Sequence, residues 1–273
     1  MTKRLISAVF GTAVVILVLA FNDMCPFILN ASIAVICGLS VFEVFSAMDI
    51  YKAYYLVIPS IIFSVIMPLF GVNVIWQISL YLFTVIIFSI MIFNYKVFSF
   101  RDISATYSMT LIITLSLSTI VMIRNINGDS GVFYVTIALA MPWMTDVGAF
   151  FVGRGLGKKK LCPNISPNKT VEGAVGGVLT SVLSMVLISF MFQLWWFKVP
   201  VSVNYLYLII MSVIGAFMAI LGDLCFSFVK RSCHVKDFGN AFPGHGGFLD
   251  RFDSVILTAP FVYLFTMYIP IIA

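Results

Sequence analysis

Charged residues are scarce in this sequence. Asp, Glu, Lys and Arg make up 10% of its 273 residues, whereas 62% of the residues are apolar and the mean hydropathy is +1.10. Soluble domains carry about 25% charged residues, so the composition excludes a soluble globular protein. It excludes a disordered or collagen-like chain on the same grounds. The composition indicates an integral membrane protein.

Cysteine and clustered basic residues are also scarce. The five cysteines form no CxxC pair and have no histidine at the spacing of a zinc site, so we interpret them as unpaired and expect neither a metal knuckle nor a disulfide framework. The 16 Lys and Arg exceed the 11 Asp and Glu, but the longest basic run is Lys158, Lys159 and Lys160. This pattern argues against a nucleic-acid partner and favours a membrane surface or a phosphate compound.

Long apolar runs predict the fold. A bilayer crossing needs about 20 apolar residues, and the runs predict an all-α, polytopic integral membrane protein with about nine transmembrane helices in a single domain, 1–273. The first run follows Lys3 and Arg4 like a secretory signal, but no small-residue cleavage site follows it, so we interpret it as an uncleaved helix. The nine runs are 5–21, 27–47, 54–70, 74–93, 104–123, 131–152, 173–197, 205–229 and 254–272.

The distribution of Lys and Arg predicts the orientation. With the N-terminus in the cytoplasm, 14 of the 16 basic residues fall on the inner side and only Arg124 and Lys198 fall outside. An odd number of helices then leaves the C-terminus outside. The two longest loops, 154–172 and 230–253, are both cytoplasmic, so we expect the functional site in the half 131–273, at the cytoplasmic face of the inner membrane. The helices of 1–130 carry no comparable motif.

Acidic residues near the second loop suggest a metal site. Asp250 and Asp253 are three residues apart and share a face near the start of the ninth helix if that helix begins before them. Asp223 lies inside the eighth run, on one helical face with Ser227 and Lys230. A carboxylate within a membrane is costly unless it is paired, lines a wet cavity or binds a cation. Because Mg²⁺ takes a few carboxylates together with phosphate oxygens and water, these three acids suggest a Mg²⁺ site.

The same loop has the features of an anion site. The turn Gly244, His245, Gly246, Gly247 would let backbone amides approach a phosphate, with His245 as a further donor. The alternative is that the glycines only form a turn and that the basic residues only set the topology and attract lipid headgroups.

Two other acids lie within apolar runs. Asp146, in the sixth run, is expected to face the cytoplasmic end of its helix, either as part of a substrate site or paired with Arg154. Glu43, in the second run, is expected to line a cavity or to pair with a lysine, and we assign it no chemistry.

The first loop ends in a helix-start pattern. The residues 166–170 form a capping run that is expected to start the seventh helix, with Glu172 in its first turn. Lys169 within this run is also free to contact a phosphate.

Two blocks of sequence resemble a known family. The segment from Ser227 to Asp253 reads S-x-V-K-R-x4-K-D-x-G-x2-F-P-x-H-G-G-x2-D-R-x-D, which resembles the signature of the phosphatidate cytidylyltransferases, also called CDP-diacylglycerol synthases. The block from Asp146 to Gly173 resembles the same family, except that Val147 and Val171 stand where Thr and Trp are common. These departures affect local packing and not the proposed ligands. The resemblance covers roughly the C-terminal half.

The resemblance implies an enzyme that transfers a cytidylyl group from CTP to phosphatidic acid, releasing pyrophosphate and forming CDP-diacylglycerol. It implies a homodimer of nine-helix protomers in the bilayer, with Mg²⁺ as cofactor and the presence of a second cation left open. The residues that it implies as metal ligands are Asp223, Asp250 and Asp253. Those that it implies as phosphate contacts are Lys169, Lys230, Arg231, Lys236 and Arg251. Further substrate-binding candidates are Asp146, Ser166, Ser227, His245, Gly246 and Gly247.

Two alternatives remain open at this point. Transfer of a cytidylyl group to another membrane lipid phosphate fits the same residues. A secondary transporter would also use the embedded acids Asp223, Asp146 and Glu43. A transporter should have related halves, and the sequence has no clear repeat.

Overall fold

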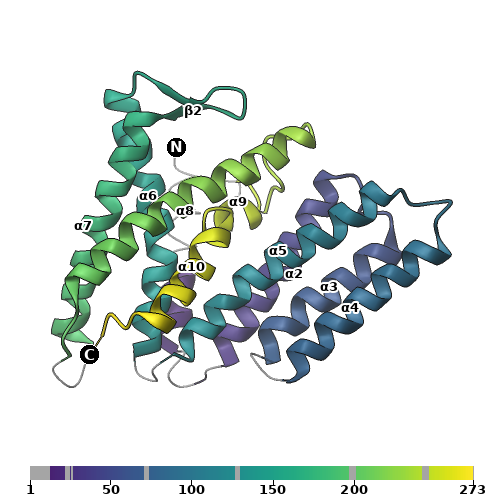
Figure 1. Cartoon of the computed structure of the whole chain (residues 1–273), viewed down its shortest axis with the longest axis horizontal. Helices are drawn as coiled ribbons and strands as arrows, with labels where there is room; N and C mark the ends of the chain where they lie inside the picture. Colours follow the sequence, from purple (N-terminus) through teal and green to yellow (C-terminus); the bar gives the residue numbers. More distant parts are fainter. Residues whose placement is uncertain are drawn as a thin grey trace. The chain divides into compact units, whose positions relative to one another are not determined.

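Helices form where the apolar runs predict them in the computed structural model, which describes residues 13–21, 25, 27–70, 74–126, 130–196, 201–241 and 246–272 (Figure 1). The helices α2 (Phe27–Ala47), α3 (Tyr54–Phe70) and α4 (Val74–Phe93) have the predicted limits. The helices α5 (Phe100–Arg124), α6 (Gly131–Leu156), α7 (Val171–Trp195) and α8 (Tyr205–Ser232) differ from their predicted limits by a few residues. Residues 13–21 of the first predicted run are helical, and Lys3 and Arg4 lie outside the described residues.

Six helices of the described chain are long and apolar enough to cross a bilayer: α2, α4, α5, α6, α7 and α8. The helix α3, with two internal prolines, and α10 (Val255–Tyr268) are apolar but shorter. Large apolar side chains are exposed on these helices, as at Leu179, Leu183 and Leu187 along one face of α7. Such a surface requires an apolar solvent. The chain is therefore a multi-pass membrane protein built from α-helices.

The chain divides into two compact units, of which the first comprises Met1–Met122 and Ser232–Phe252. In this unit α2 packs against α3 and α3 packs against α4 (Figure 1). The rings of Phe63 on α3 and Phe83 on α4 stack with their centroids 4.4 Å apart. The short helix α9 (Leu249–Phe252) packs against α2. The buried core of α3, α4 and α5 consists of Leu56, Phe63, Met67, Phe83, Ile87 and Ile103.

The second unit comprises Ile123–Arg231 and Asp253–Ala273. Its most extensive helix contact joins α6 and α7 through small residues. A Cβ atom on Gly173 would lie 2.8 Å from the carbonyl oxygen of Ala149, and one on Gly177 would lie 2.7 Å from the carbonyl oxygen of Thr145. The two backbones therefore touch, which is a common way for membrane helices to associate without a hydrophobic driving force.

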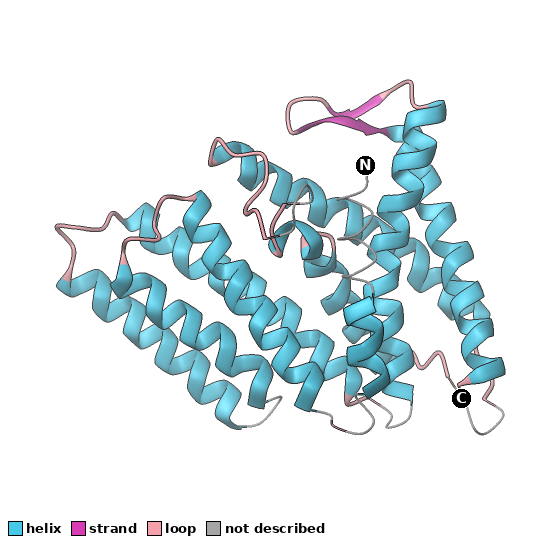
Figure 2. Cartoon of the chain, turned by 180° about the vertical axis from the view of Figure 1, so that it is seen from behind, coloured by secondary structure: helices cyan, strands magenta, loops and turns pink. Residues whose placement is uncertain are grey.

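The hairpin after α6 departs from the purely helical prediction. The strand β2 (Ser166–Thr170) pairs antiparallel with β1 (Lys160–Cys162), as Figure 2 shows in magenta. We predicted that 166–170 would begin a helix. Ser166 precedes Pro167, however, and a residue before proline favours an extended backbone. The capping prediction is correct at Thr170, whose Oγ1 accepts a hydrogen bond from the Gly173 amide at 3.1 Å, and Glu172 lies in the first turn of α7.

The predicted ninth helix is interrupted at its start. The helix α9 ends at Phe252 and α10 begins at Val255, so Asp253 lies in the turn between them. Asp250 and Asp253 consequently do not belong to one helix, and Asp250 is in the first unit whereas Asp253 is in the second.

Candidate active site

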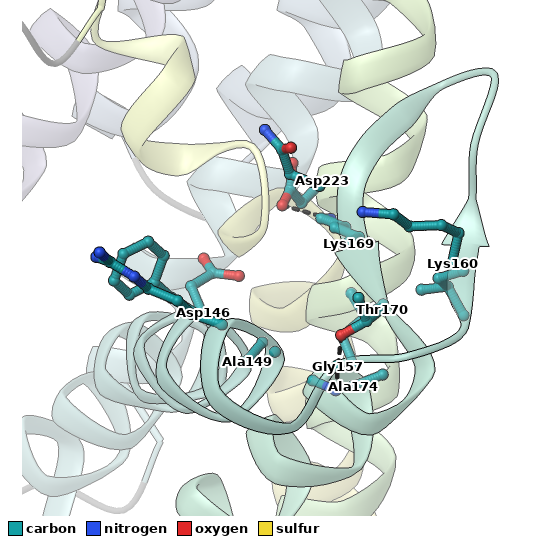
Figure 3. A pocket seen from close by; sticks show the side chains of 15 residues that line it. Asp146, Ala149, Gly157, Lys160, Lys169, Thr170, Ala174 and Asp223 are labelled. Atoms are coloured by element: carbon teal, nitrogen blue, oxygen red, sulfur yellow. Dashed lines mark hydrogen bonds and ion pairs between the residues drawn. The ribbon is translucent and has the colours of Figure 1, made fainter.

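A cavity of about 540 Å³ lies in the second unit, where α6, the hairpin, α7 and α8 meet (Figure 3). Its polar lining contains both signs of charge, and its apolar lining comes from α6, the hairpin, α7 and α8. The apolar group includes Ala149, Phe150, Leu161 and Ile220. The polar group is Asp146, Arg154, Lys160, Asn168, Lys169, Thr170 and Asp223. A cavity of this composition suits a ligand that has both an anionic and an apolar part.

An ion pair between the hairpin and α8 crosses this cavity. Lys169 Nζ lies 2.5 Å from Asp223 Oδ2, and both side chains are about a quarter exposed (Figure 3). The Ser227 hydroxyl donates to Asp223 Oδ1 at 3.2 Å, which confirms that residues 223 and 227 share a face of α8. The Lys169 Nζ atom itself is buried, so the ion pair is shielded from solvent although parts of both side chains are exposed. The ammonium group of Lys169 therefore lies inside the cavity, beside a carboxylate.

A more deeply buried pair lies beside it, at the start of α10. Lys230 Nζ lies 3.4 Å from Asp253 Oδ2, and both side chains are at most 10% exposed. Asp253 Oδ1 also accepts the Ser254 amide at 2.8 Å, and the Ser254 hydroxyl donates to Asp146 Oδ2 at 3.1 Å. Asp253, Ser254 and Asp146 thus form a connected polar group in the second unit.

Burial and the neighbouring carboxylates favour the protonated form of Asp253. Burial, followed by the neighbouring carboxylate of Asp223, raises the pKa of Asp253 to about 8. Lys230 acts in the opposite direction, and Asp146 raises the pKa further. Three acids therefore repel one another in this part of the unit, and the lysines only partly offset that repulsion.

Asp223 and Asp253 are carboxylates of the second unit that could take part in holding a divalent cation. In the described part of the chain, no three Asp, Glu, His or Cys side chains are arranged so that they could hold a metal ion together. Asp223 and Asp253 nevertheless interact electrostatically, and a cation between carboxylates would remove the repulsion. Mg²⁺ is commonly held by one or two carboxylates with substrate phosphates and water as its other ligands. These two residues would be its protein ligands in the second unit.

The loop before α9 forms a separate polar arrangement in the first unit. Asp250 Oδ2 accepts the amides of Phe238 at 2.8 Å and Gly247 at 2.9 Å. Gly246 has φ +82°, a backbone conformation that favours glycine. One carboxylate oxygen therefore joins the backbone at Phe238 to the backbone at Gly247.

Glu43 on α2 binds the same loop. Its two carboxylate oxygens accept the amides of Phe248 and Leu249, both at 2.9 Å. These contacts are with backbone amides, and they replace the lysine pair or cavity lining that we expected.

The predicted site residues thus fall into two groups. The second unit contains Asp146, Ser166, Lys169, Asp223, Ser227, Lys230, Arg231 and Asp253. Of these, Arg231 Nε donates to the Ile165 carbonyl at 3.5 Å, next to the hairpin turn. The first unit contains Lys236, Gly246, Gly247, Asp250 and Arg251. His245 lies outside the described residues.

Four polar residues of the cavity were absent from the predicted set: Arg154, Lys160, Asn168 and Thr170. Lys160 pairs with Thr170 across the hairpin and so lies beside Lys169. Pro163 and Asn164, between two short extended segments, are the turn signal that a hairpin prediction would have used.

Comparison with known sequences identifies the family. A model of the cytidylyltransferase family matches residues 2–269, which include both motif blocks and nearly all of both units. The chain belongs to the cytidylyltransferase family. The resemblance that the 146–173 and 227–253 blocks indicated is therefore confirmed.

Similar members of the family are bacterial proteins named phosphatidate cytidylyltransferase. The chain is 44% identical over 141 residues to one from Bacillus subtilis strain 168, and the aligned region covers 52% of this chain and 49% of the relative. It is 43% identical over 136 residues to one from Staphylococcus saprophyticus, which covers 48% of each. The chain thus spans about half the length of these curated relatives. A relative from Rickettsia conorii is 32% identical over 210 residues, which are 75% of this chain and 88% of the relative.

Proposed function

We propose that the protein transfers a cytidylyl group from CTP to phosphatidic acid, forming CDP-diacylglycerol and pyrophosphate for phospholipid synthesis. The observation that carries the proposal is the cavity of the second unit, where Arg154, Lys160 and Lys169 gather beside Asp223 in a membrane-embedded helical unit. Cations suit phosphate groups, and the apolar lining suits a lipid. The family and the names of its members support the same reaction.

The chemistry needs no activated side-chain nucleophile. A phosphate oxygen of phosphatidic acid is already anionic and attacks the α-phosphorus of CTP. The bond from that phosphorus to the bridging oxygen breaks, and pyrophosphate leaves with the electron pair. The main barrier is the repulsion between two anions, so positioning and charge neutralisation supply the catalysis. In this proposal Lys169, Arg154 and Lys160 hold the phosphates together and neutralise part of their charge.

Mg²⁺ is the proposed cofactor, with the presence of a second cation left open. Asp223 and Asp253 would hold it, and Asp250 is retained as a third ligand on the strength of its motif alone. When bound, the metal would stabilise charge on the phosphate oxygens. The lysine at residue 169 would release Asp223 as the substrate phosphate arrives, because the ammonium group can bind either anion.

The membrane arrangement is part of the proposal. We propose nine transmembrane helices, with the N-terminus in the cytoplasm, the C-terminus outside and the site open to the cytoplasm, where CTP is available. The protein would work in the inner membrane as a homodimer. The 14 to 2 distribution of basic residues supports the orientation.

The deciding experiment is an assay of the purified full chain in detergent with labelled CTP, phosphatidic acid and Mg²⁺. We expect a lipid-soluble cytidine product and stoichiometric pyrophosphate, both requiring all three components. Asp223→Asn should lower turnover by about a hundredfold, because a carboxylate that organises a metal contributes several kcal/mol to the transition state. Asp102→Asn makes the same chemical change in the first turn of α5 and should leave turnover near that of the unaltered protein.

Three results would count against the proposal. If CTP is not consumed while reconstituted vesicles accumulate a solute, the protein is a transporter. If CTP is consumed only with a different lipid phosphate, the acceptor is wrong. If Asp223→Asn protein remains folded and turns over at the normal rate, Asp223 is not in the site.

A further inference from the structure

The carboxylate of Glu43 makes two long-range contacts with the backbone. Its Oε1 accepts the Phe248 amide and its Oε2 accepts the Leu249 amide, each at 2.9 Å, across separations of 205 and 206 residues. Glu43 as a whole residue is 9% exposed. A carboxylate on an apolar helix is costly unless its oxygens are satisfied. Two charge-assisted hydrogen bonds to adjacent amides satisfy both oxygens.

Two glycines bring the loop backbone directly onto this carboxylate. A Cβ atom on Gly239 would lie 2.5 Å from Glu43 Oε1, and one on Gly247 would lie 2.3 Å from both carboxylate oxygens. Real Cβ atoms do not approach oxygen so closely, and the obstructing group is itself held by two hydrogen bonds. Glycine at 239 and 247 is therefore required by the position of Glu43.

Asp250 holds the same loop from within. Its Oδ2 accepts the amides of Phe238 and Gly247, so Gly247 lies against Glu43 and is bonded to Asp250 at the same time. Every residue from Gly247 to Leu249 thus donates its amide to one of two carboxylates. The backbone position of residues 247–249 therefore depends on Asp250 and on an acid of α2.

We infer that Glu43 is a positioning residue, which anchors the backbone of residues 247–249 to α2 and so holds the proposed phosphate contacts Gly246 and Lys236 in place. The anchoring is independent of the reaction, whereas the consequence for phosphate binding rests on the proposed function. Glutamate is specifically suited, because both of its oxygens only accept hydrogen bonds. Glutamine would direct an NH2 group at one of the two donating amides.

Hydrogen exchange of the intact, purified chain tests the anchoring without an activity assay. In Glu43→Gln protein we expect amides of 246–252 to exchange at least about tenfold faster than in the unaltered protein, because a hydrogen bond to a charged group is lost. Glu172→Gln is the matched control. The Glu172 carboxylate accepts the amides of Lys158 and Lys159, so this variant should deprotect that segment and leave 246–252 unchanged.

A double-mutant cycle then tests the consequence for the substrate. Gly239→Ala inserts a methyl group where Glu43 stands and should displace the loop without altering any charge. Each single variant should raise the KM for CTP by about tenfold with a smaller change in kcat, since the loop contacts are made in the bound ground state. The KM of the double variant should be little higher than that of either single variant, because both substitutions break the same contact.

The outcomes separate the anchoring of the backbone by Glu43 from its consequence for phosphate binding. Unchanged exchange of 246–252 in Glu43→Gln protein overturns the anchoring, whatever the activity. Faster exchange across all helices, or fully additive losses in KM, overturns the positioning role and assigns Glu43 to general stability. Absence of any cytidylyl transfer by the unaltered protein would contradict the proposed function. The anchoring by Glu43 would then be tested by the hydrogen-exchange result alone.

Discussion

At the scale of single residues, acids are scarce and several serve as anchors for the backbone. Glu43, Glu172 and Asp250 each accept two backbone amides. Asp223 and Asp253 instead pair with lysines. A charged acceptor in or beside an apolar helix bundle makes a stronger hydrogen bond than in water, so one carboxylate can hold a loop that has no hydrophobic core of its own.

Asp253 gives a prediction about pH. Because burial and Asp223 raise its pKa to about 8 from 3.8, the folded protein holds a proton that the unfolded chain releases. The proton therefore stabilises the folded protein fully at pH values below the ordinary pKa of 3.8, and this stabilisation is lost as the pH rises through about 8. The unfolding temperature in detergent without divalent cations should fall between about pH 5 and about pH 9, and Asp253→Asn should flatten that slope.

The same measurement with Mg²⁺ tests the proposed ligand. Binding requires the deprotonated carboxylate, so Mg²⁺ should raise the unfolding temperature more at about pH 8 than at about pH 6. The gain should shrink in Asp253→Asn protein. Identical slopes and identical Mg²⁺ effects in the two proteins would remove Asp253 from both roles.

At the scale of elements, the join between the hairpin and α7 positions Lys169. Thr170 caps α7 through the Gly173 amide, and Glu172 in the first turn accepts the amides of the two residues just before β1. Gly157 lies within the same join, where a Cβ atom would be 2.7 Å from Thr170 Oγ1. A short two-stranded hairpin is marginal by itself, so these contacts with α6 and α7 hold it in place.

Thr170→Val should therefore destabilise the protein while Thr170→Ser should not. Valine keeps the shape of threonine but lacks the oxygen that accepts the Gly173 amide, and loss of such a cap costs about 1 kcal/mol. We expect the unfolding temperature to drop by roughly 2–4 °C for the valine variant. An equal drop in the serine variant would mean that packing of the methyl group, and not the cap, is what matters.

At the scale of the whole molecule, native cysteines report the proposed topology. We expect an impermeant thiol reagent to label Cys162 and Cys233 only from the cytoplasmic side and Cys25 from the outside. Burial raises the pKa of the Cys233 thiol, so its labelling needs mildly alkaline buffer. Buried Cys37 should stay unlabelled and serves as the internal control. Labelling of Cys233 in intact cells would contradict the proposed orientation.

Residue type and spacing were enough to predict the membrane class and most helix limits. A single apolar run of bilayer length can satisfy its backbone hydrogen bonds within itself only as a helix. The helices α2, α3 and α4 accordingly have the limits predicted from the sequence. The structure of the polar loops was harder to predict. The hairpin depends on pairing between residues near Lys160 and Thr170, and a cap pattern at Thr170 looks the same whether a strand or a coil precedes it.

The sequence by itself determined where apolar and polar segments lie, that Asp223 and Ser227 share a helical face, and which family the motifs belong to, because these depend on local periodicity and residue order. Only the tertiary structure decided the partners of the charged groups. Lys230 pairs with Asp253, Lys169 with Asp223, and Glu43 with amides 205 and 206 residues away. A carboxylate has the same chemistry toward a lysine, a metal or an amide, so its partner depends on which group packing brings within about 3 Å.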